Sequence, residues 1–178
     1  IAKKLGVKKI VLGECGHAHK ALTVIADKVL TGDLNIPRES SMVTLRDIIR
    51  SGVLKLDNSR NDFPVTLHDP CNLTRGGGVY EEQRYILKHC VKNFVEMNPH
   101  GVDNLCCGGG GRKISMSEYN ERRMGIGKLK AEQIRHTGAV VVATPCHNCV
   151  DQLIQINADN KLNVKIKTMA EIVADAIV

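Results

Sequence analysis

Short apolar runs alternate with stretches of helical periodicity along most of this 178-residue chain. The clearest apolar run, AVVVAT at 139–144, is typical of a fully buried strand. Further strands are expected at 8–14, 63–69, 102–106 and 164–167. The expected helices span 17–30, 44–52, 78–94, 118–138, 146–159 and 169–178. Strands that alternate with helices predict an α/β fold, with a parallel sheet and flanking helices.

Two parts of the chain resemble each other. The segment IVLGECGHAHKAL aligns with VVATPCHNCVDQL, so that Cys15 falls on Cys146 and Ala18 falls on Cys149. The segment TLRDII resembles TMAEIV in the same order along the chain. This self-similarity predicts an internal duplication.

The duplication predicts two structural units. Residues 1–62 would be the C-terminal part of a first, degenerate unit, and residues 63–178 a complete second unit. The parts of the first unit that would match the middle of the second are missing. We therefore expect the chain to be a fragment of a longer protein.

The chain contains seven cysteines, and five of them fall in the predicted second unit with a clear rhythm. These five are Cys71, Cys106, Cys107, Cys146 and Cys149. Each group follows a predicted strand, and the carboxyl ends of parallel strands meet at one edge of a sheet. Three distant segments are thus expected to bring five thiols together. Clustered cysteines in a reducing compartment are typical of metal ligands or redox groups. Cys90, within a predicted helix, is expected to be a core residue.

The neighbours of these cysteines suit thiolates. Cys146 and Cys149 would lie in the first helical turn, where the helix dipole lowers the pKa of a thiol. His68 and His147 adjoin the cysteines, and both are candidate donors of hydrogen bonds or protons. The glycine run after Cys107 allows a close approach of backbone N–H groups. The candidate cofactor-binding residues are Gly108, Gly109, Gly110 and Arg112.

The cysteine pattern fits some metals better than others. Zinc takes four ligands, so five cysteines with an adjacent pair exceed its needs. A cubane cluster usually takes four cysteines from a closely spaced run, which the chain lacks. The pattern favours a larger, irregular iron–sulfur assembly. Zinc, a redox-active Cys146–Cys149 pair and buried thiols without metal remain as alternatives.

The arrangement Cys71…Cys106-Cys107-Gly108…Cys146-x-x-Cys149 resembles the cysteine-rich CCG domain of heterodisulfide reductase B subunits. It is also similar to fused iron–sulfur subunits of membrane redox complexes in sulfur metabolism. The resemblance covers residues 63–178, and more weakly the preceding copy.

The resemblance implies a non-cubane [4Fe-4S] cluster held by the five cysteines. The implied activity is electron transfer, reductive cleavage of a disulfide-like substrate, or both, as in a heterodisulfide reductase-like oxidoreductase. The implied partners are other redox subunits of a membrane-associated complex, with a disulfide or thiol as substrate. The first copy has Ala18 in place of a second cysteine, so it is not expected to hold such a cluster. Cys15 or His17 would face the cluster of the second copy.

Composition narrows the location and the partners. The net charge is +6, but aromatic residues are only 3%, which argues against single-stranded nucleic acid as a partner. No apolar run reaches the roughly 18 residues that span a bilayer, and the N-terminus has no signal-peptide pattern. We expect a cytoplasmic location, peripheral at the inner face of the membrane. The alternative function is a zinc-stabilised docking module without catalysis. If the cofactor is an iron–sulfur cluster, we expect protein prepared in air to lose it.

Overall fold

A parallel sheet of four strands, in the order β4-β3-β5-β6, forms the centre of the molecule. The computed structural model describes residues 1–110 and 113–178. The strands of this sheet are β3 (Pro64–Leu67), β4 (Asn93–Val95), β5 (Val141–Ala143) and β6 (Lys165–Lys167). The inner pair aligns Val65 with Val141 and Leu67 with Ala143. The predicted α/β class, a parallel sheet with flanking helices, is confirmed.

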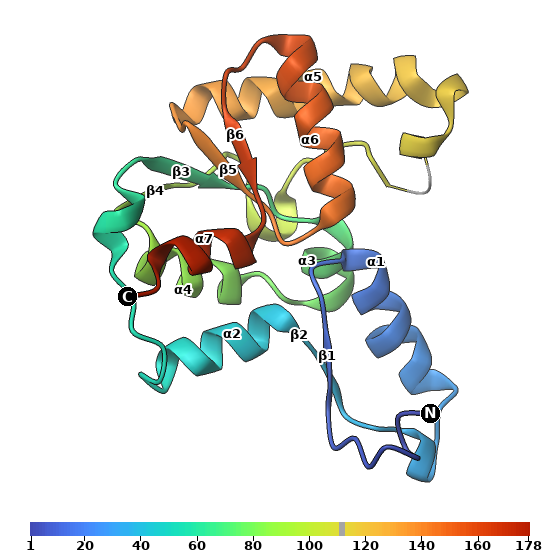
Figure 1. Ribbon diagram of the computed structural model, residues 1–178. Coiled ribbons are helices and arrows are strands. Elements are labelled where there is room, and N and C mark those ends of the chain that lie inside the picture. Colours follow the sequence, from blue (N-terminus) through green and yellow to red (C-terminus); the bar gives the residue numbers. More distant parts are fainter. Residues whose placement is uncertain (111–112) are drawn as a thin grey trace.

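Helices cover both faces of the sheet (Figure 1). They are α3 (Cys71–Gly77), α4 (Glu81–Cys90), α5 (Asn120–Thr137), α6 (His147–Asn160) and α7 (Met169–Ala176). Successive side chains of a strand point to opposite faces. Val141 and Ala143 accordingly join the core with α4 and α7, whereas Val142 joins the core with α5 and α6.

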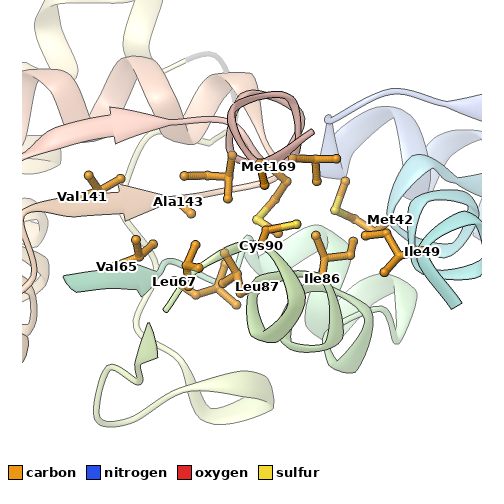
Figure 2. Close-up of a cluster of buried hydrophobic side chains, with 14 of the residues drawn as sticks. Met42, Ile49, Val65, Leu67, Ile86, Leu87, Cys90, Val141, Ala143 and Met169 are labelled. Carbon is orange, nitrogen blue, oxygen red and sulfur yellow. The ribbon is translucent and has the colours of Figure 1, made fainter. Parts of the chain in front are cut away.

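The larger core lies between the sheet, α4, α7 and α2 (Ser41–Arg50), as Figure 2 shows. Met42 and Ile49 of α2 reach into it from the predicted first unit. Cys90 lies in this core with no exposed surface, so its predicted packing role is confirmed. Burial also raises the pKa of the Cys90 thiol to about 11, which keeps it protonated.

The N-terminal region has a small parallel sheet of its own (Figure 1). Strand β1 (Ile10–Leu12) pairs with β2 (Arg38–Ser40). Between them lie α1 (Gly16–His19), the π-helical η1 (Lys20–Ile25) and the 3₁₀ turns η2 (Ala26–Lys28) and η3 (Gly32–Leu34). Strand β2 was not predicted, because its polar sequence, Arg-Glu-Ser, carries no strand signal.

Other predicted boundaries differ from the structure. The strand expected at 102–106 is wrong: its place is taken by the 3₁₀ turn η5 (Gly101–Asp103) and a loop. The helix expected at 78–94 ends at Cys90, and its last residues form the edge strand β4. The remaining 3₁₀ turns are η4 (Asn58–Asn61), η6 (Lys113–Ser115) and η7 (Ser117–Tyr119).

Glu14 joins the N-terminal region to the rest of the molecule. Its buried carboxylate accepts hydrogen bonds of 2.8 Å each from the backbone N–H groups of Met169 and Ala170, at the start of α7. Its carbonyl accepts a further bond of 3.0 Å from the N–H of His147. Glu14, which follows β1 by two residues, therefore contacts the first turns of two helices.

Candidate metal centre

All five predicted ligand cysteines line one cavity at the carboxyl edge of the four-stranded sheet. They come from three segments: the start of α3, the loop that precedes η6, and the start of α6. The convergence predicted from the ends of strands occurs, although the segment before Cys106 is not a strand. None of the seven cysteines forms a disulfide.

The thiols of the five cysteines lie close together around the cavity. The sulfur atoms of Cys71 and Cys106 are 4.0 Å apart, and those of Cys107 and Cys149 are 3.5 Å apart. Cys106 and Cys107, and likewise Cys146 and Cys149, shift the pKa values of each other.

Helix starts position three of the thiols. Cys71 is the first residue of α3, Cys146 is the N-cap of α6, and Cys149 lies in the first turn of α6. Backbone N–H groups at a helix start have no partner within the helix, so they can point toward an anion. The backbone N–H groups near the sulfur of Cys146, which include that of Gly16 at the start of α1, help to lower the pKa of this thiol.

The glycine run is closely packed beneath the paired cysteines. Gly108 has a φ of +90°, which L side chains rarely adopt, and its N–H donates to the sulfur of Cys106 at 3.3 Å. A Cβ on Gly109 would lie 2.7 Å from the Cβ of Gln152 in α6. Glycine is therefore required here by backbone conformation at one position and by close packing at the other. Arg112 lies outside the described residues.

The pKa values of the thiols diverge because the groups lie so close together. Hydrogen bonds from Cys107 and Cys71 lower the pKa of Cys106, and a hydrogen bond from Cys149 lowers that of Cys146 to about 6. The hydrogen bond to Cys106 raises the pKa of Cys107 to about 12, and the hydrogen bond to Cys107 raises that of Cys149. Five adjacent thiolates repel one another, so the set ionises fully only when positive charge enters the cavity.

His68 lies on the inner side of the site. A nitrogen of its ring and the sulfurs of Cys107 and Cys149 all lie within 4.8 Å of one another. The side chain is 1% exposed, and neither ring nitrogen has a hydrogen-bond partner among the described residues. Burial lowers the pKa of His68, so the imidazole is neutral and has one N–H to donate.

The other predicted groups lie farther out. His147 is exposed and does not line the cavity, whereas the exposed His17 does, 3.4 Å from the side-chain amide of Asn148. The sulfur of Cys15 accepts a bond from the N–H of Ala18 and caps α1, and it does not line the cavity.

A buried ion-pair network holds the ligand segments in place, and it was not predicted from the sequence. Arg84 donates to both oxygens of Asp69, at 3.0 and 2.8 Å, and to both oxygens of Glu96, at 2.7 and 3.0 Å. Asp69 also accepts a 2.7 Å bond from the N–H of Gly101, on the segment that leads to Cys106. The Asp-Pro-Cys sequence before α3 was the available signal.

The donor set fits a thiolate-ligated metal assembly. Five contacting thiols supply more sulfur than one tetrahedral zinc ion uses. A neutral histidine with free nitrogens and glycine amides directed at sulfur are groups that stabilise sulfur ligands.

Comparisons with known proteins found a cysteine-rich family and redox subunits among the relatives of the chain. Residues 65–154 match the family described as "CCG: Cysteine-rich domain". The chain is 32% identical over 178 residues to a subunit of the dihydromethanophenazine:CoB–CoM heterodisulfide reductase of Methanosarcina mazei, covering 98% of this chain and 42% of that one. It is 29% identical to the Hdr-like menaquinol oxidoreductase iron-sulfur subunit of Archaeoglobus profundus, covering 99% and 38%. It is 37% identical to a subunit of the fumarate reductase (CoM/CoB) of Methanothermobacter marburgensis, covering 72% and 26%.

The chain thus spans about two fifths of the length of the first two relatives. Within the described residues, no helix has the length and apolar character needed to cross a membrane.

Proposed function

The chain belongs to the cysteine-rich CCG domain family, and from this premise we propose that it is an iron–sulfur domain of a heterodisulfide reductase-like oxidoreductase. Its cofactor is a non-cubane [4Fe-4S] cluster bound by Cys71, Cys106, Cys107, Cys146 and Cys149. The domain transfers electrons, cleaves a disulfide-like substrate, or does both. The names of the relatives as reductase and iron-sulfur subunits support a redox role.

The convergence of five cysteine thiols on one cavity, with two sulfur pairs at 4.0 Å or less, carries the proposal. A cubane or a zinc ion would leave at least one of these thiols without a metal. An adjacent pair of thiols suits a cluster whose irons are held by neighbouring ligands. Such a cluster, when bound, supplies one-electron transfer and a metal site for sulfur.

The residues of the chain supply the surroundings for that chemistry. Reductive cleavage of a disulfide consumes two electrons and two protons and releases two thiols. We propose that partner redox subunits of a membrane-associated complex provide the electrons. The imidazole of His17 at the cavity wall can donate a proton to a substrate that enters there. His68 and the amides of Gly108 and Gly109 hold the sulfur ligands from inside.

The test is anaerobic reconstitution with iron and sulfide, followed by metal analysis and electron paramagnetic resonance. We expect about four irons per wild-type chain. Cys107→Ser removes a central ligand and should prevent assembly of the intact cluster, whereas Cys90→Ser, in the core, should leave the iron content unchanged. Equal loss of iron in both variants would show that the ligands are misassigned.

Zinc is the second candidate, because His68, Cys107 and Cys149 offer three close ligand atoms. With one more thiol they would complete a tetrahedral site in a docking module without catalysis. A colourless protein with one zinc per chain after anaerobic purification would favour this function over the cluster.

A further inference from the structure

Lys130 is a buried lysine in the middle of α5, and its side chain is among the largest that the fold encloses completely. It lies on the inward face of the helix with Arg123, Gly127, Ala131 and Ile134. Lysine is almost never fully buried unless its charge is compensated. Its position therefore requires a physical reason.

The contacts of the ammonium group do not supply that compensation. Its Nζ atom donates to the amide oxygen of Gln133 at 2.5 Å and lies 3.7 Å from the sulfur of Met97. Both partners are neutral. Among the described residues, no carboxylate forms an ion pair with Lys130. Asp69 is the one carboxylate among the main groups that raise the pKa of Lys130, and it already accepts hydrogen bonds from both terminal nitrogens of Arg84 and from the N–H of Gly101.

The other groups whose negative charge, once they are ionised, raises the pKa of Lys130 are the side chains of Cys106, Cys107 and Cys149. Met97, which the ammonium contacts, belongs to the same core cluster as Cys107 and Cys149, so the lysine and these thiols border one core. Burial lowers the pKa of Lys130 to about 8, which leaves it largely charged at neutral pH. A buried positive charge without an ion pair is costly in the metal-free chain and is compensated when anionic ligands gather nearby.

We propose that Lys130 is a positioning residue whose fixed positive charge balances the negative charge of the metal–thiolate assembly from the inner side of the site. The inference rests on the proposed function, because the partner of the charge is the cluster bound by the five thiols. The charge favours the reduced, more negative state, and it helps to retain thiolate ligands that would otherwise repel one another.

The test compares Lys130→Met with Lys128→Met, a change to an exposed lysine two positions away on the same helix. Methionine matches the length of the lysine stem and removes the charge. After anaerobic reconstitution, redox titration monitored by electron paramagnetic resonance should show a lower midpoint potential for Lys130→Met only. We expect a shift of the reduction equilibrium by roughly tenfold, or about 59 mV for a one-electron couple.

A second measurement uses the metal-free chains and does not depend on the cluster. Loss of an uncompensated buried charge should raise the urea midpoint of metal-free Lys130→Met above that of the wild type, whereas a lysine that stabilises the fold mainly through its hydrogen bond to Gln133 would give a lower midpoint in the variant. A lower urea midpoint, or a midpoint potential equal to that of the wild type, would overturn the role of Lys130. A wild-type chain that takes up no iron would instead overturn the proposed function, and the role of Lys130 with it.

Discussion

Two helices of this molecule, α1 and α6, begin at a cysteine in nearly the same backbone conformation. The two cysteines have different surroundings. The N-cap of α1 is Cys15, with φ −151° and ψ 107°, and that of α6 is Cys146, with φ −159° and ψ 114°. This likeness supports the predicted duplication. Cys146 lines the cavity, whereas the sulfur of Cys15 accepts a hydrogen bond from the N–H of Ala18. In the alignment of the two segments, the position of Ala18 corresponds to the proposed ligand Cys149.

Under the predicted duplication, the start of α1 keeps the backbone conformation of the start of α6 without its proposed ligand role. Gly16 and His17 both line the cavity. The start of α1 thus forms part of the wall around the proposed ligands at the other helix starts.

The largest expected effect comes from exchanging the two equivalent thiols for serine. Cys146→Ser should lose most of its iron after reconstitution, because a thiolate ligand is removed. Cys15→Ser should retain the iron content of the wild type, since a serine hydroxyl also caps a helix. Iron and sulfide analysis of both variants checks this, and iron loss from Cys15→Ser would show that α1 carries a ligand.

A smaller effect is expected from adding a methyl group to a glycine in each region. Gly109→Ala places a Cβ against Gln152, so we expect the free energy of unfolding to fall by about 1–3 kcal/mol. Nothing lies within 4 Å of a Cβ on Gly13, just before α1, so Gly13→Ala should change stability by less than about 1 kcal/mol. Urea unfolding of both metal-free variants measures the contrast. Similar costs would mean that the glycine loop is not tightly packed against α6.

The smallest effect concerns Glu14, which aligns with the uncharged Pro145 of the predicted second unit. Burial raises the pKa of Glu14 above its ordinary value of 4.5, so the folded chain binds its proton more tightly than the unfolded chain does. The unfolding free energy of the wild type relative to Glu14→Gln should therefore fall as the pH rises above 4.5, through the folded pKa. Denaturant unfolding between about pH 4 and 7 measures this slope. A difference that grows with pH would show that the two backbone N–H groups outweigh burial.

The sequence predicted those parts of the molecule that follow from local patterns. The segment AVVVAT contains the central strand β5. The first and last cysteine groups follow β3 and β5, and they meet in the cavity because the carboxyl ends of these strands lie at the same edge of the sheet. The segment 102–106 was misread because its apolar ends resemble a strand. A distant group, Asp69, holds its backbone in a turn through the N–H of Gly101. Such a long-range bond has no local signature.

The burial of Lys130 also could not be predicted from the sequence. A lysine is ordinarily read as a surface residue, and α5 is polar overall. Its spacing from Gly127 and Ile134 does match one helical face, but only the packed structure reveals that this face is the buried one. The duplication and its boundary between residues 62 and 63 stay predictions.

The position of Gly16 and His17 in the cavity wall bears on how much of the chain the site needs. The residues that match the family, 65–154, leave out Gly16 and His17 at one wall of the cavity and the whole of β6 and α7. A chain trimmed to those limits would open the thiols to water and oxygen from that side, and it would expose the apolar underside of the sheet. The shortest fragment that keeps the five thiols protected from solvent therefore has to begin before Glu14.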